Sequence, residues 1–163
     1  MSEIAERTRL LLDICKERGI LVATAESCTG GMIVSLMTDL PGSSSMVDRG
    51  FVTYSNEAKM EMLGVAGETL ELHGAVSEAT ALEMAVGALS RSRAGLALSV
   101  TGIAGPDGGS EEKPVGLVWF GLALNGQGPK TERRIFENGG RDYVRHQAAY
   151  HAIEMALEAL NEG

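Results

Sequence analysis

The segment Ile20-Leu-Val-Ala-Thr-Ala25, followed by Glu26-Ser-Cys-Thr-Gly-Gly31, decides the fold. The first six residues are almost all apolar and short, which is typical of a strand buried on both faces. The small polar residues and glycines after them predict a turn into a helix that runs from Thr29 to about Leu40, before Pro41. A buried strand that turns directly into a helix is the unit from which α/β domains are built.

The same alternation continues on both sides of this segment. Helices are predicted over 3–18, from 56, over 77–92 and over 141–161, and strands over 50–55, 96–100, 115–124 and 130–137. The last two strands form an antiparallel hairpin because the turn Asn125-Gly-Gln-Gly128 joins them. The pattern predicts a three-layer α/β/α sandwich with a mixed, mostly parallel central sheet. Without a repeat, linker or change of composition, residues 1–163 are predicted to form one domain.

Charge and composition exclude several classes of protein. The chain has 14 Lys and Arg against 22 Asp and Glu, for a net charge of −8, which disfavours a nucleic-acid backbone as partner. It also disfavours an anionic membrane surface, and no apolar run is long enough to span a membrane. The segment Met1–Ile4 does not resemble a secretory signal, so a cytoplasmic location is expected. Cys15 and Cys28 are expected to be reduced thiols, and with only 3 histidines no metal site is predicted.

Four loops are predicted at strand ends, where α/β sheets bind ligands: Glu26–Gly31, Pro41–Ser45, Tyr54–Lys59 and Thr101–Pro114. The helix start after Glu26 suits either an anion or a plain turn capped by Ser27 or Thr29. The loop from Thr101 is long and glycine-rich, which favours an ordered binding loop over a mobile surface loop.

Candidate nucleophiles are few. No Gly-x-Ser-x-Gly motif is present, and His73 (in a predicted loop), His146 and His151 are expected to be surface or packing residues. Cys28 is expected to be a buried structural cysteine rather than a nucleophile. A serine of Ser43–Ser45 with Lys59 as base remains possible. A lysine base near pH 7 needs its pKa lowered by about 3 units, which costs about 4 kcal/mol and requires burial.

Four motifs, in this order, resemble the CinA C-terminal domain family over about residues 10–160. They are Thr24-Ala-Glu-Ser-Cys-Thr-Gly-Gly31, Gly50-Phe-Val-Thr-Tyr-Ser-Asn-Glu-Ala-Lys59, His73-Gly-Ala-Val-Ser-Glu78 and Thr101-Gly-Ile-Ala-Gly-Pro-Asp-Gly-Gly-Ser-Glu-Glu-Lys-Pro-Val-Gly116. The family includes competence/damage-inducible proteins and stand-alone nicotinamide-nucleotide amidohydrolases. The resemblance therefore implies hydrolysis of nicotinamide mononucleotide to nicotinate mononucleotide and ammonia, in pyridine-nucleotide recycling.

The resemblance also implies a set of site residues. It assigns Ser44 as the nucleophile, Lys59 as its base and Tyr54 as a relay or a support for the lysine. It implies no metal and no cofactor, and it suggests a homo-oligomer. The residues implied to bind substrate are Ser27, Thr29, Gly30, Gly31, Thr101, Gly102, Gly105 and Arg141.

Of these residues, Arg141 and the helix start at Ser27–Gly31 are the expected phosphate ligands. In addition, Glu26 is expected beside the pyridinium of the substrate. Backbone amides of residues 42–45 or of the glycine-rich loop are expected to form an oxyanion hole. Two alternatives stay open: a non-catalytic nucleotide-binding or regulatory domain, and a DNA-transaction protein, which the charge of −8 disfavours.

Overall fold

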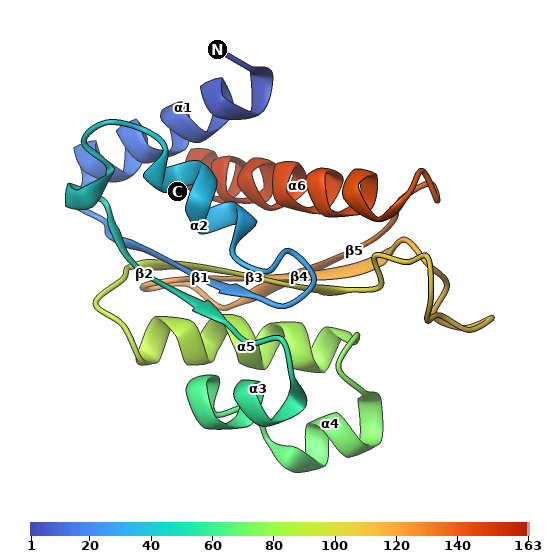
Figure 1. Cartoon of the computed structure of the whole chain (residues 1–163). Coiled ribbons are helices and arrows are strands. Elements are labelled where there is room, and N and C mark those ends of the chain that lie inside the picture. The colour runs from blue at the N-terminus through green and yellow to red at the C-terminus, as the bar shows by residue number, and fades with distance from the viewer. Residues whose placement is uncertain (163) are drawn as a thin grey trace.

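A five-stranded sheet in the order β2-β1-β3-β4-β5 forms the centre of the computed structural model, which describes residues 1–162 (Figure 1). The strands are β1 Val22–Glu26, β2 Val47–Val52, β3 Leu96–Gly102, β4 Leu117–Leu124 and β5 Lys130–Ile135. The helices are α1 Glu3–Arg18, α2 Met32–Thr38, α3 Asn56–Leu63, α4 Gly67–His73, α5 Glu78–Ser90 and α6 Arg141–Glu162, with a short 3-10 turn η1 at Ser43–Ser45.

The sheet is mixed, as predicted. Strand β1 pairs in parallel with β2 and β3, whereas β4 pairs antiparallel with both β3 and β5. In this register Glu26 lies opposite both Val52 and Val100. The three parallel strands therefore end at the same level, and the residues that follow them meet at one edge of the sheet.

Helices cover both faces of the sheet. Helices α1, α2 and α6 lie on one face, and α3, α4 and α5 lie on the other (Figure 1). The larger apolar cluster lies on the first face and includes Leu11, Ile33, Phe120 and Ile153, all 0% exposed. The smaller cluster includes Leu63 and Met84 from the second face. The three-layer α/β/α prediction is confirmed, and the double cover explains why the inner strands β1, β3 and β4 are buried on both sides.

Local signals set the ends of several helices where they were predicted. Ser2 caps α1 through its hydroxyl, which accepts from the amide of Ala5, and Gly19 ends the helix with a φ of 66°. Ser77 caps α5 in the same way, through the amide of Thr80.

Other boundaries were predicted wrongly. Helix α4 was not expected, and His73, placed in a loop by the sequence reasoning, is its last residue. It begins at Gly67 after Ala66 with no side-chain cap, so the usual signals of a helix start are missing. Strand β2 begins at Val47 rather than Gly50.

Candidate active site

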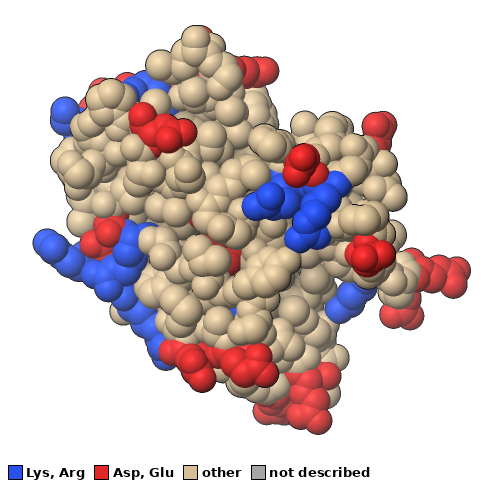
Figure 2. All heavy atoms as spheres, in the orientation of Figure 1, with Lys and Arg blue, Asp and Glu red and all other residues tan. Residues whose placement is uncertain are grey.

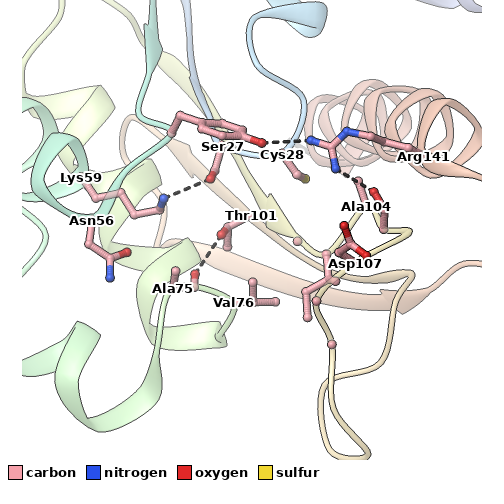
Figure 3. A pocket seen from close by; sticks show the side chains of 16 residues that line it. Ser27, Cys28, Asn56, Lys59, Ala75, Val76, Thr101, Ala104, Asp107 and Arg141 are labelled. Carbon is pink, nitrogen blue, oxygen red and sulfur yellow. Dashed lines mark hydrogen bonds between the residues drawn. The ribbon is translucent and has the colours of Figure 1, made fainter.

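A cavity of about 330 Å³ lies beyond the carboxyl ends of β1 and β3. The turn after β1 supplies Ser27 and Cys28, and the segment after β2 supplies Tyr54, Asn56 and Lys59. The end of β3 and the glycine-rich loop after it supply residues 101–105 and 107–109. Arg141, at the start of α6, completes the rim (Figure 3). Three of the four loops predicted to meet at strand ends therefore line one cavity.

The innermost polar contact joins Lys59 and Ser27. Lys59 Nζ lies 3.0 Å from Ser27 Oγ (Figure 3). It also donates to the carbonyl oxygen of Thr53 at 2.9 Å. The lysine is only 1% exposed, and no carboxylate of residues 1–161 forms a salt bridge with it. Burial lowers the pKa of Lys59, against a smaller opposing effect of Cys28. A neutral amine at this distance can accept the proton of the Ser27 hydroxyl.

The turn that carries Ser27 is built around Glu26. The Glu26 side chain is fully buried, and its carboxylate accepts hydrogen bonds from the amides of Gly31, Ile33 and Val34 at 3.2, 2.9 and 3.0 Å. Thr24 Oγ1 donates to the same carboxylate. An internal carboxylate therefore already occupies the start of α2, where the sequence suggested an anion site.

This arrangement changes the expected roles of several residues. The Glu26 carboxylate binds backbone amides and does not line the cavity, contrary to the expectation that it would accompany a ligand there. Thr29, Gly30 and Gly31 shape the turn and do not line the cavity. The two glycines have φ values of 57° and 104°, which explains why this turn needs glycine.

A hydrogen-bonded bridge spans one side of the cavity. Arg141 Nη1 donates to the carbonyl oxygen of Gly105 at 2.7 Å, and Nη2 donates to Tyr54 Oη at 2.9 Å (Figure 3). Tyr54 is 64% exposed, and its hydroxyl is bound to Arg141 rather than to Lys59. The bridge therefore connects the ends of β2 and β3 through α6.

The glycine-rich loop is anchored where it leaves the sheet. Thr101 Oγ1 donates to the carbonyl oxygen of Ala75 at 2.8 Å, and Lys113 Nζ donates to that of His73 at 2.6 Å. A Cβ at Gly102 would lie 2.7 Å from the side chain of Val118. These contacts favour the ordered binding loop over the mobile loop.

The structure does not bring Ser44 and Lys59 together. Ser44 lies in η1, before β2, and the amide of Val22 at the start of β1 donates to the carbonyl of Met46. Lys59 lies beyond the other end of β2, whose six residues at about 3.3 Å each span about 20 Å. The serine beside the lysine is Ser27, and the 42–45 loop is too distant to supply an oxyanion hole there.

Other cavity residues were not identified from the sequence. Asn56, the first residue of α3, and Asp107, in the glycine-rich loop, both line the cavity (Figure 3). Cys28 also lines it but is 7% exposed, and burial raises the pKa of its thiol to about 12. The expectation of a buried cysteine is confirmed. Position within a glycine-rich strand-end loop was the available signal for Asp107.

Three further features concern metal ligands, membrane-spanning helices and surface charge. Among the side chains of residues 1–161, no three His, Cys, Asp or Glu are grouped so as to hold a metal ion. Over the same range, no helix has the length and hydropathy needed to cross a membrane. On the face shown in Figure 2, basic side chains form small separate groups with acidic ones nearby.

Fold and site together define an α/β domain with a buried serine–lysine pair at the ends of its parallel strands. Comparison with known proteins identifies the family: the model of the CinA C-terminal domain matches residues 4–160. The chain belongs to the CinA C-terminal domain family.

Individual relatives are similar over nearly the whole chain. A nicotinamide-nucleotide amidohydrolase PncC of Escherichia coli is 54% identical over 153 residues, covering 94% of this chain and 92% of that protein. A putative competence-damage inducible protein of Symbiobacterium thermophilum is 53% identical, covering 88% of this chain but 35% of that protein. The crystal structure of the competence/damage inducible protein CihA from Agrobacterium tumefaciens has a TM-score of 0.95 and 50% identity, covering 99% of this chain and 97% of that one.

Proposed function

We propose that this chain, as a single domain over 1–163, is an amidohydrolase that converts nicotinamide mononucleotide and water to nicotinate mononucleotide and ammonia. The observation that carries the proposal is the 3.0 Å contact between Ser27 Oγ and the buried Lys59 Nζ. The PncC relative, at 54% identity, supports the choice of substrate. The nucleophile that we propose is Ser27, in place of Ser44.

The reaction proceeds in two halves. Neutral Lys59 accepts the hydroxyl proton of Ser27 while Oγ attacks the carboxamide carbon. The tetrahedral intermediate collapses as Lys59 returns the proton to the leaving nitrogen, which releases ammonia and leaves an ester on Ser27. Water then attacks the ester, Lys59 accepts a proton from it and passes that proton to Ser27 Oγ, and nicotinate mononucleotide leaves.

The residues that line the cavity support the proposal that it binds a mononucleotide. Arg141 is the cation on the rim, and it is suited to the 5′-phosphate because guanidinium binds phosphate through two parallel hydrogen bonds. Another part of the wall is lined by Thr101 and Gly102, at the end of β3, and by Gly105, in the glycine-rich loop. Tyr54 holds Arg141 through its hydroxyl, so its proposed role is to position that guanidinium rather than to relay a proton.

The test measures ammonia released from nicotinamide mononucleotide and from nicotinamide riboside, which lacks the phosphate. We expect turnover of the mononucleotide, a much higher KM for the riboside, and a similar rise in KM when Arg141→Ala acts on the mononucleotide. A thermal-shift titration with the mononucleotide runs in parallel. Binding without ammonia release would overturn the proposal and favour the non-catalytic nucleotide-binding domain.

A further inference from the structure

The turn that carries Ser27 is held by a second arginine of α6. Arg145 Nε donates to the carbonyl oxygen of Cys28 at 3.0 Å, and Arg145 Nη2 donates to that of Thr29 at 3.1 Å. The Ser27 amide donates to the carbonyl of Val100 at 2.9 Å, and the Gly30 amide donates to the carbonyl of Ser27 at 3.0 Å. One guanidinium therefore binds the two peptide carbonyls that directly follow the serine.

The position of Arg145 is not explained by the stability of α6. Arg141 and Arg145 are four residues apart and lie on the same face near the amino end of the helix. Cations at a helix amino end are disfavoured by the helix dipole. Arg141 lines the cavity, whereas Arg145 is partly buried behind the turn and does not line it. The two arginines therefore face the same site from different sides.

Two hydrogen bonds from one planar guanidinium restrict the backbone more than two hydrogen bonds from separate groups would. The guanidinium presents its donors in a rigid fork, and hydrogen bonds from a charged donor are about twice as strong as neutral ones. Each peptide unit is planar, so fixing the carbonyls of Cys28 and Thr29 fixes the orientation of both units. The path of the chain directly after Ser27 is therefore determined from α6.

We infer that Arg145 is a positioning residue for the reaction, which rests on the proposed function of the Ser27–Lys59 pair. It holds the turn so that Ser27 Oγ stays 3.0 Å from Lys59 Nζ. It does not touch the substrate. Glu26 anchors the opposite side of the same turn through the amides of α2, so the serine is held between a carboxylate and a guanidinium.

The chain offers a matched control. Arg7 on α1 makes a comparable two-bond contact, with Nε and Nη2 at 2.6 and 2.9 Å from the Glu154 carboxylate of α6. That contact also ties a segment to α6 but does not line the cavity. A loss of protein stability that follows from removing either arginine can thus be separated from an effect on Ser27 that follows only from removing Arg145.

The experiment compares Arg145→Ala, Arg145→Lys and Arg7→Ala with the wild type in the ammonia-release assay, with a thermal melt of each protein. For Arg145→Ala we expect kcat to fall about 100-fold, the loss that a misplacement of about 1 Å causes, with KM within about threefold of wild type. Low concentrations of guanidinium chloride are expected to restore part of kcat in this variant only. Arg145→Lys is expected to stay well below wild type because an ammonium cannot bind both carbonyls as a fork.

The outcomes separate the inference from the proposed function. Wild-type kcat in a folded Arg145→Ala protein, or a rise in KM alone, overturns the positioning role while leaving the amidohydrolase proposal intact. If Arg145→Ala does not fold, Arg145→Lys decides: wild-type kcat in that variant overturns the inference. Absence of ammonia release from the wild type would instead overturn the proposed function itself.

Discussion

Replacing Lys59 by methionine should abolish turnover and stabilise the protein. The Lys59 side chain is 1% exposed, and methionine fills nearly the same volume without an amine. Burial lowers the pKa of Lys59, so the folded state destabilises the charged form of this amine. Each pKa unit of lowering costs about 1.4 kcal/mol. The variant removes this cost but also loses the contacts with Ser27 and Thr53, at about 1 kcal/mol each.

The sign of the pH dependence follows from the same shift. Between the lowered folded pKa of Lys59 and its unfolded value of about 10.4, the unfolded chain binds more protons. Wild-type stability contributed by this group therefore rises with pH across that window. The Lys59→Met variant lacks this dependence, so its advantage should be largest near neutral pH and should disappear above about pH 10.4.

Thermal unfolding at several pH values measures both effects. We expect the Tm of Lys59→Met to exceed that of wild type near pH 7, with the difference shrinking as the pH rises toward about 10.4, and a loss of kcat of at least about 100-fold. Lys113→Met is the control, because Lys113 lies in the glycine-rich loop, binds the His73 carbonyl and does not line the cavity. Retained turnover in Lys59→Met would refute the assigned base. If Lys59→Met is less stable than wild type at neutral pH, and its stability follows that of wild type as the pH rises, the charged form of Lys59 is not disfavoured by burial.

Three further predictions concern the walls of the site. Glu26→Gln leaves the three amides at the start of α2 without a charged acceptor, so unfolding should become easier by about 2 kcal/mol in a denaturant titration; unchanged stability would contradict the role of Glu26 as a buried cap. Tyr54→Phe removes one partner of Arg141, so KM for the mononucleotide should rise several-fold with kcat nearly unchanged; a large fall in kcat would instead indicate proton transfer by Tyr54. Gly102→Ala places a Cβ 2.7 Å from Val118, so Tm should fall by several degrees, and an unchanged melt would show that the loop can shift.

Much of the fold could be predicted because local signals and periodicity agree. The apolar run after Ile20 forms β1, and α1 begins after Ser2 and ends before Gly19, as predicted. Helix α4 was missed because its start has no capping side chain and its first residue is glycine. Its position is set instead by tertiary contacts such as the Glu83 carboxylate, which accepts from Ala66 N and Thr69 Oγ1.

The candidate site was predicted in part. Loops at the ends of parallel strands were expected to meet, and Ser27, Tyr54, Lys59, Thr101 and Arg141 do line one cavity. The choice of Ser44 as a partner for Lys59 was wrong because the loop at Pro41–Ser45 precedes β2, whereas Lys59 follows it. The loop before a parallel strand lies at the opposite edge of the sheet from the loop after it.

The roles around Ser27 depend on contacts that sequence spacing does not reveal. A carboxylate followed by a glycine-rich turn resembles a ligand for a cation, yet Glu26 folds back onto the amides of α2. Arg145 is 116 residues from Thr29, whose carbonyl it binds. The spacing of Arg141 and Arg145 on α6 was the one local sign that this helix face approaches the site.

The assignment of Ser27 as the nucleophile is tested most directly by two matched variants, Ser27→Ala and Ser44→Ala. The quantity measured is the rate at which each releases ammonia from nicotinamide mononucleotide. Both remove one hydroxyl, from opposite ends of the parallel strands. We expect Ser27→Ala to lose turnover, because the Ser27 hydroxyl lies 3.0 Å from Lys59 Nζ, and Ser44→Ala to keep the wild-type rate. Wild-type turnover in Ser27→Ala, with loss in Ser44→Ala, would contradict the assignment.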